Sequence, residues 1–204
     1  MGYMVNLTVE GRGALVVGGG EIAARKVEDL LAARARVTVV APRIGDRIEA
    51  LADRVPIHRR PYDSGDIGES FVVIAATDDE ELNARVSRDC AARHVIVNVV
   101  DRPALCTFTV PATVHRGDLT IAISTDGRCP AFASILREEL ERRYGTEYGE
   151  LVELFAQLRK QMIARGWAGP KIRQKLASIY KDGVIELIAA SDEQRLRDLL
   201  IRFC

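Results

Sequence analysis

The stretch ALVVGGGEIA, residues 14–23, decides the fold of this chain. Its apolar residues predict a buried strand and its glycines a tight turn, and the residues that follow, to about Arg34, carry apolar side chains at helical spacing. The glycines fit the pattern G-x-G-x-x-A, in which Gly18 makes the turn, Gly20 lets the backbone approach a pyrophosphate and Ala23 allows close helix packing. The helix N-terminus would present free N–H groups to the phosphates. The stretch therefore predicts a dinucleotide-binding strand, turn and helix.

The alternation of strand and helix continues to about residue 101, which indicates repeated βα units around a parallel sheet and an α/β fold. Asp78 or Asp79 is the predicted N-cap of a later helix. After residue 103 the pattern changes to alternating strands, and from Pro130 it is helical almost to the end, with a capping box predicted at 191–194. The predicted strands are 37–40, 71–76, 95–100, 107–110 and 119–124, a helix is predicted at 80–93, and breaks between the later helices are predicted at Gly145 and 166–170.

One position departs from the dinucleotide pattern. The second predicted strand ends about 20 residues after the glycines, where an Asp or Glu usually binds the adenosine ribose. Ala41, Pro42 and Arg43 occupy this place. Backbone groups of these residues could bind the ribose, Arg43 could accept a 2′-phosphate, or Arg43 could be a solvated surface residue, and the sequence leaves all three open.

Composition excludes several classes of protein. The chain has 204 residues, 48% of them hydrophobic, and its 29 Lys and Arg balance 29 Asp and Glu. No apolar run approaches the roughly 20 residues of a membrane helix, and no signal peptide is recognisable, so we expect a cytoplasmic protein without a membrane partner. Charge balance removes the case for non-specific nucleic-acid binding, although a local basic pocket stays possible. The spacing of Cys90, Cys106, Cys129 and Cys204 indicates reduced thiols and neither a metal site nor disulfides.

Several ordered motifs resemble one family. They are VVGGGEIAARK at 16–26, AATDD at 75–79, NVVD at 98–101, Phe108 with Pro111, and STDGRCP at 124–130. Together they resemble the siroheme synthase amino-terminal family of precorrin-2 dehydrogenases, some of which are also sirohydrochlorin ferrochelatases. The resemblance covers about residues 3 to 145, and the helical remainder resembles the family only in length and composition.

The resemblance implies a domain plan and an activity. An NAD-binding Rossmann-like domain is expected at 1–112, a small α+β dimerisation region at 113–145 and a helical C-terminal domain at 146–204, in a homodimer. The implied activity is NAD-dependent dehydrogenation of precorrin-2 to sirohydrochlorin in siroheme biosynthesis. Ferrochelation of sirohydrochlorin stays open, because some relatives lack it.

The resemblance also implies site residues. Asp101 matches the aspartate of NVVD and is the expected general base, although without the family we would rank first an Asp that caps the turn before Pro103. The residues expected at the cofactor are Gly18, Gly20, Glu21, Ile22, Pro42, Arg43, Thr77 and Asp78. The residues expected at the tetrapyrrole substrate are Asn98, Arg102, Arg116, Ser124, Gly127 and Arg128. No metal ligands are expected.

Each of these assignments has a simpler alternative. Asn98 could fix backbone, Thr77 and Asp78 could only cap the next helix, and each arginine could be a solvated charge. Two other functions also remain open. The chain could be a regulatory Rossmann module that senses NAD without catalysis, or a structural dimerisation protein with a vestigial site. Anaerobic turnover of precorrin-2 with NAD would separate the first from an enzyme, and calorimetry with NAD would test the second.

Overall fold

The computed structural model describes residues 2–201, which fall into two compact units divided between Val110 and Pro111. The first unit carries the parallel sheet, and the second carries a small antiparallel sheet and the later helices. The α/β fold class predicted from the sequence is therefore confirmed. The predicted division at residues 145 and 146 stays a prediction. Cys204 lies outside the described residues.

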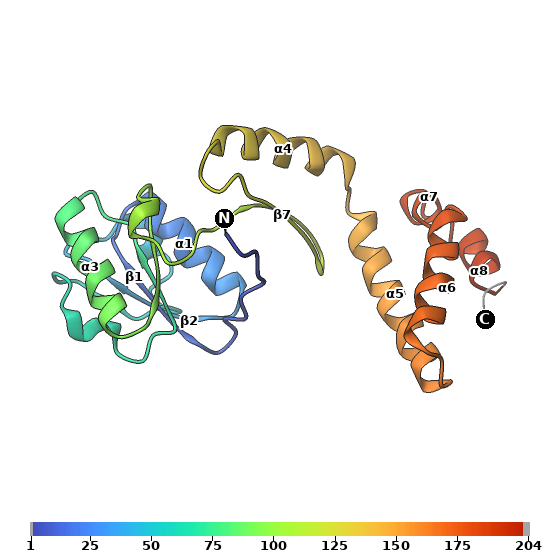
Figure 1. Cartoon of the computed structure of the whole chain (residues 1–204), viewed down its shortest axis with the longest axis horizontal. Coiled ribbons are helices and arrows are strands. Elements are labelled where there is room, and N and C mark those ends of the chain that lie inside the picture. The colour runs from blue at the N-terminus through green and yellow to red at the C-terminus, as the bar shows by residue number, and fades with distance from the viewer. Residues whose placement is uncertain (1, 202–204) are drawn as a thin grey trace. The chain divides into compact units, whose positions relative to one another are not determined.

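Five parallel strands in the order β3-β2-β1-β4-β5 form the sheet of the first unit (Figure 1). Their Val- and Ile-rich runs are buried because helices cover both faces, as expected for a parallel sheet. In register, Val17 pairs with Val40 and Ala75, and Ala75 pairs with Val99. Four strands therefore end at one edge. The strands are β1 (Gly13–Val17), β2 (Arg36–Val40), β3 (Ile57–His58), β4 (Val72–Ala75) and β5 (Ile96–Val99).

Two long helices pack against opposite faces of this sheet (Figure 1). Helix α1 (Glu21–Ala32) buries Ala23, Ala24 and Val27 in one core cluster, so the predicted close packing at Ala23 is confirmed. Helix α3 (Glu80–Ala92) buries Val86 and Cys90 in the other. Burial raises the pKa of the Cys90 thiol to about 11, which keeps it protonated. Short elements complete the unit: α2 (Asp46–Glu49), η1 (Ser64–Ile67) and η2 (Pro103–Leu105).

The turn between β1 and α1 needs glycine for the sake of the protein itself. Gly18 has φ +131, and a Cβ built on it would lie 2.2 Å from the carbonyl oxygen of Ala76. A Cβ on Gly19 would lie 2.0 Å from the carbonyl oxygen of Arg43. The backbones that follow β2 and β4 therefore press against this turn, and no side chain fits between them.

The strand predicted at 107–110 is wrong. The backbone N–H of Thr107 donates to the Val97 carbonyl, and the Val97 N–H donates to Thr107 Oγ1 at 2.7 Å. Cys106 Sγ accepts from the Val99 N–H at 3.1 Å. The side chains of Cys106 and Thr107 thus take hydrogen bonds that a neighbouring strand would have made with β5. Residues 107–110 therefore add no sixth strand to the parallel sheet.

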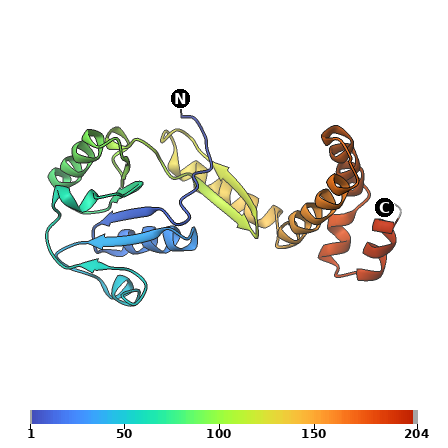
Figure 2. The same ribbon diagram turned by 90° about the horizontal axis from the view of Figure 1, so that it is seen from below.

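The second unit begins with a hairpin of β6 (Ala112–Arg116) and β7 (Leu119–Ile123), with α4 (Pro130–Arg143) packed on both strands (Figure 2). The predicted strand at 119–124 and the helix start at Pro130 are confirmed. Arg116 joins the hairpin to the C-terminus of α4. Its guanidinium donates to the carbonyls of Tyr144 at 2.7 Å, His115 at 2.8 Å and Glu141 at 2.9 Å. The bonds to Glu141 and Tyr144 satisfy carbonyls at the end of α4 that have no partner within the helix.

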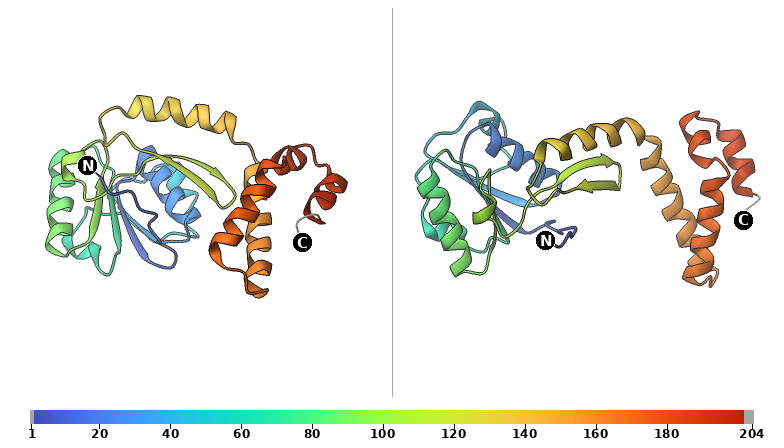
Figure 3. Two further views of the ribbon diagram at one scale, coloured as in Figure 1. Left: turned by 45° about the vertical axis from the view of Figure 1, so that its right-hand side comes forward. Right: turned by 45° about the horizontal axis from the view of Figure 1, so that its top comes forward.

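Four further helices pack around a core that includes Leu158, Met162, Ile179 and Val184 (Figure 3). The predicted breaks near Gly145 and before Pro170 are present, and an unpredicted break occurs at Gly183, which has φ +84. The helices are α5 (Glu147–Ala164), α6 (Gly169–Lys181), α7 (Val184–Ala189) and α8 (Glu193–Ile201).

The capping box predicted at 191–194 is wrong. Ser191 is in the left-handed region at φ +52, and the carboxylate of Asp192 accepts the Arg195 N–H at 3.1 Å. The cap therefore lies one residue later than predicted. Within residues 2–201, no helix has the length and apolarity needed to cross a membrane.

Replacing Gly18 by Ala is expected to lower the free energy of unfolding of the first unit by at least about 2 kcal/mol, because the new Cβ meets backbone and φ is unfavourable. Urea denaturation followed by circular dichroism measures this. Gly20→Ala is the matched control, since a Cβ there meets nothing within 4 Å, and it should stay near the parent. Equal stability of the two variants would contradict the turn geometry.

Arg116→Ala should lower the free energy of unfolding of the second unit by about 1–3 kcal/mol, since three hydrogen bonds from one cation are lost. Fluorescence of Trp167, the only tryptophan, reports this unit in urea. Arg128→Ala, at an exposed arginine of the same unit, should change it by less than about 0.5 kcal/mol. The prediction fails if the two variants unfold at the same urea concentration.

Candidate functional site

One cleft of about 1410 Å³ lies where the parallel strands of the first unit end. Turns after β1, β2, β4 and β5 all contribute to its lining. Ligands of open α/β sheets bind beyond the carboxyl ends of the strands, so this is the expected place for a site. The predicted residues that line the cleft are Gly18, Gly20, Glu21, Ile22, Pro42, Arg43, Thr77, Asp78, Asp101 and Arg102.

Gly20 differs from the two glycines before it. A Cβ built on Gly20 meets no protein atom within 4 Å, and its φ of −88° suits any residue. No described side chain caps α1, whose first internal bond runs from the Ala24 N–H to the Gly20 carbonyl at 2.9 Å. Open space beside Gly20 and uncapped N–H groups fit the pyrophosphate of a dinucleotide.

Glu21, at the start of α1, does not bring its charge to this turn unopposed. Arg47 Nη1 lies 3.3 Å from the Glu21 carboxylate, and the same guanidinium binds Glu28 through contacts of 2.5 and 2.7 Å. Its hydrogen bond holds the pKa of Glu28 below the ordinary value. An anionic ligand at the helix N-terminus therefore meets a carboxylate that is already paired.

The turn after β2 supplies backbone and one cation. Ala41 is buried, whereas Pro42 and Arg43 are exposed and line the cleft. The Arg43 carbonyl faces Gly19, and the Gly45 N–H donates to the Gly19 carbonyl at 2.9 Å. The backbone of this turn is thus fixed against the glycine turn, which leaves the Arg43 side chain available to a ligand.

The turn after β4 is held by its own side chains. The Thr77 hydroxyl donates to Asn83 Oδ1 at 2.8 Å, and Asn83 Nδ2 donates to the Thr77 carbonyl at 2.9 Å. Asp79 is the N-cap of α3, because its carboxylate accepts the Leu82 N–H at 3.0 Å. Asp78 lines the cleft and is exposed. Of the two candidate caps, the structure selects Asp79, and the Thr77 hydroxyl already has a partner.

Asp101 is the second residue after β5 and lines the cleft with the glycine turn. Its φ of +57 is left-handed, a conformation that Asp and Asn tolerate better than most residues. Its carboxylate is exposed. The neighbouring Arg102 also lines the cleft and forms an ion pair with Glu80. The turn therefore presents one exposed carboxylate and one paired cation to the cleft.

Asn98 is not among the residues that line the cleft. It is 9% exposed within β5, and its Nδ2 donates to the Phe108 carbonyl at 3.1 Å. This bond fixes the segment that follows Asp101 against the strand, as in the simpler alternative for Asn98. Its role toward a substrate stays a prediction.

The other four predicted substrate residues belong to the second unit. Ser124, Gly127 and Arg128 share the loop between β7 and α4, where Ser124 Oγ accepts the Asp126 N–H at 3.1 Å and Gly127 has φ +74. Arg116 lies apart from that loop, and its donors bind carbonyls at the end of α4. Their roles toward a substrate stay predictions.

Several polar residues of the cleft were not among the predicted site residues: Tyr62, Asp79, Glu80, Glu81, Asn83, Arg85 and Arg88. The Tyr62 hydroxyl donates to Asp89 at 3.1 Å, the Arg85 guanidinium lies 5.5 Å from the centre of the Tyr62 ring, and burial raises the pKa of the phenol. For Arg85 and Arg88 the only sequence signal was their spacing on a predicted helix. Among the described residues, no group of three or more His, Cys, Asp or Glu could hold a metal ion.

Comparisons with known proteins agree with this geometry. Residues 5–112 match the family described as "Putative NAD(P)-binding", and residues 116–143 match "Sirohaem biosynthesis protein central". A siroheme synthase of Thioalkalivibrio sulfidiphilus is 38% identical over 201 residues, which are 97% of this chain and 41% of that protein. A siroheme synthase of Ectopseudomonas mendocina is 44% identical over 154 residues, 76% of this chain and 33% of that protein. The chain thus spans about two fifths or less of the length of these relatives.

A solved structure matches over nearly the whole chain. It is described as "SirC, precorrin-2 dehydrogenase", with a TM-score of 0.79 and 26% sequence identity over 98% of each chain. The family segments follow one another along residues 5–143 in the order that the motifs predicted. The chain therefore belongs to the siroheme synthase amino-terminal family and carries its NAD(P)-binding domain.

Proposed function

We propose that this protein is an NAD-dependent precorrin-2 dehydrogenase, which oxidises precorrin-2 to sirohydrochlorin in siroheme biosynthesis. The observation that carries the proposal is that Gly20 and Asp101 line the same cleft. One residue leaves room for a pyrophosphate, and the other offers an exposed carboxylate. The similarity to a precorrin-2 dehydrogenase over 98% of the chain supports the choice of substrate.

The protein's own part in the reaction is to position two ligands and to take a proton. A bound NAD supplies the acceptor for the hydride that leaves precorrin-2. The uncapped N-terminus of α1 and the turn at Gly20 would hold the pyrophosphate. Asp101 would accept the proton that the substrate loses with the hydride, so that one hydride and one proton together account for the oxidation.

Arginines of the first unit would bind the carboxylates of the substrate. Arg102, Arg85 and Arg88 line the cleft with Asp101, and guanidinium groups bind carboxylates with two parallel hydrogen bonds. Ser124, Gly127 and Arg128, which share one exposed loop, would be further contacts for substrate carboxylates. The choice of NAD over NADP rests on the family resemblance, and Arg43 is the side chain available for a 2′-phosphate.

The proposal includes a homodimer formed through residues 113–145. Only Ala133 of α4 is buried, whereas Phe132 is 49% exposed and Ile135 is 59% exposed. Exposed apolar side chains on one helix support burial against a second copy. Ferrochelation is a further activity that the resemblance includes, and in it the same Asp101 carboxylate would take pyrrole protons as iron enters.

Asp101→Asn is expected to lower kcat by about 10² to 10⁴-fold, because the general base is lost. Asparagine tolerates the left-handed backbone, so the turn should persist. The measurement is anaerobic incubation with precorrin-2 and NAD, in which sirohydrochlorin absorbance and NADH appear together, and calorimetry should give an unchanged Kd for NAD. Unchanged turnover would show that another residue is the base. If the parent protein binds NAD but does not turn over precorrin-2, a regulatory module that senses NAD would be favoured.

Gly20→Val should weaken NAD binding at least about tenfold, because the side chain enters the space assigned to the pyrophosphate. Calorimetry measures the Kd, and thermal unfolding checks the fold, which should be near that of the parent since no protein atom opposes the new Cβ. If Gly20→Val binds NAD as tightly as the parent, the position assigned to the cofactor is wrong.

A further inference from the structure

The chain is neutral as a whole, but its charges are unevenly distributed. Residues 154–181 contain seven basic side chains and no acidic one. This segment forms the second half of α5, the following turn and all of α6, which pack against each other. The basic residues are Arg159, Lys160, Arg165, Lys171, Arg173, Lys175 and Lys181. A local basic surface therefore exists within a protein of zero net charge.

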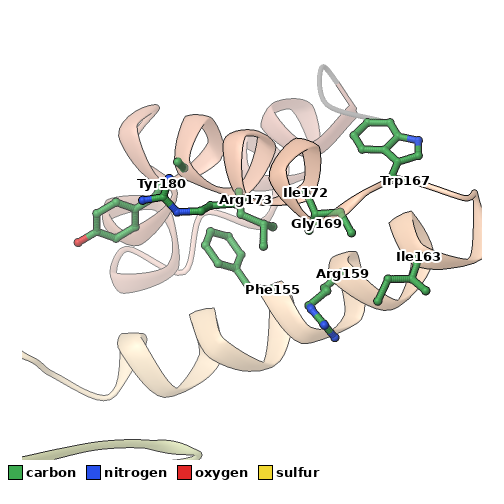
Figure 4. Close-up of a pocket in the computed structure, with 10 residues that line it drawn as sticks. Phe155, Arg159, Ile163, Trp167, Gly169, Ile172, Arg173 and Tyr180 are labelled. Atoms are coloured by element: carbon green, nitrogen blue, oxygen red, sulfur yellow. The ribbon is translucent and has the colours of Figure 1, made fainter.

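A groove of about 550 Å³ lies between these two helices. Figure 4 shows Phe155 of α5 pointing toward α6, with Trp167 at one end of the groove and Tyr180 at the other, and Ile163 of α5 also lines the groove. Ile172, Leu176 and Ala177 of α6 complete an apolar lining. The volume falls within the range of about 300–1,000 Å³ that is usual for small-molecule sites. We call this cavity the α5–α6 groove.

The aromatic ends of the groove are fixed in place. Lys171 Nζ lies 4.0 Å from the centre of the Trp167 ring, which is a cation–π contact. Tyr180 is hydrogen-bonded to Tyr148, a bond that raises the pKa of Tyr148 to about 12. A flat ligand would thus meet aromatic walls whose positions are already set, which reduces the entropy cost of binding.

Two arginines that line the groove have no polar partner in the part of the chain that the structure describes. Neither Arg159 nor Arg173 takes part in an ion pair or hydrogen bond among residues 2–201, although most paired arginines of the chain contact a carboxylate. One comes from α5 and the other from α6. Uncompensated guanidinium groups beside an apolar cavity favour anionic groups attached to an apolar body.

We propose that the α5–α6 groove binds a flat aromatic or macrocyclic polycarboxylate, with its ring against the apolar lining and two carboxylates on Arg159 and Arg173. Both helices belong to the second unit, whereas the cleft of the proposed dehydrogenase lies in the first. The groove is therefore a second ligand site. Its occupation does not depend on turnover, and the proposed function could fail without affecting it.

The only tryptophan of the chain lines the groove, so its fluorescence reports binding there. We would titrate the full-length protein with uroporphyrin I, a flat macrocycle with carboxylates around its edge. Saturable quenching of Trp167 is expected. In the double variant Arg159→Ala/Arg173→Ala the apparent Kd should rise at least tenfold, with far-UV circular dichroism confirming the fold.

Two further variants test whether charge alone explains binding. Lys160→Ala removes a neighbouring charge that does not line the groove, and it should bind within about twofold of the parent. Ala177→Phe keeps both arginines but fills part of the groove, and it should weaken binding at least fivefold. Equal losses in Lys160→Ala and the double variant would overturn the proposal, because they would indicate non-specific attraction to a basic surface.

Other anions identify the ligand class. AMP and a single-stranded oligonucleotide should cause little quenching and should not displace uroporphyrin I at physiological salt. Displacement by the oligonucleotide would overturn the proposal in favour of a nucleic-acid surface, and displacement by AMP would overturn it in favour of a phosphate site. Quenching that is unsaturable, or identical in the parent and the double variant, would also reject it.

Discussion

The fold of the first unit depends on close contacts between backbone segments at the glycine turn between β1 and α1. Gly18 lies against the carbonyl of Ala76, and Gly19 lies against the carbonyl of Arg43, at distances that leave no room for a Cβ. These contacts bring the ends of β1, β2 and β4 together, since each strand leads into one of the three turns. The cleft depends on this arrangement, because its lining comes from those turns.

The parallel sheet could be predicted from the sequence because its strands are continuous apolar runs that alternate with amphipathic helices. β3 has two residues and α2 has four, so neither is long enough to show a periodicity. The segment after Asp101 was misread as a strand because its β-branched residues alternate, whereas Cys106 and Thr107 use their side chains to bind the edge of β5. Local pattern does not reveal where a side chain replaces a ladder bond.

The site residues that could be predicted from the sequence are those in the turns that follow the strands. The glycine turn, Pro42, Arg43, Thr77 and Asp101 follow directly from strand ends, and they do line one cleft. Tertiary packing decides whether the side chains of Tyr62, Arg85 and Arg88 point toward the cleft, so the sequence alone could not place them there. The hydrogen bonds of Arg116 to the carbonyls at the end of α4 could be seen only in three dimensions, and its role toward a substrate stays a prediction.

The three glycines of the turn are required for two different reasons. Positions 18 and 19 are constrained by neighbouring backbone, whereas position 20 is constrained by nothing within the polypeptide. Selection for a folded molecule would conserve the first two, and only selection for the nucleotide would conserve the third. A homologue that keeps glycine at the positions of Gly18 and Gly19 but has a larger residue at that of Gly20 would therefore be expected to keep the fold and to have lost the coenzyme.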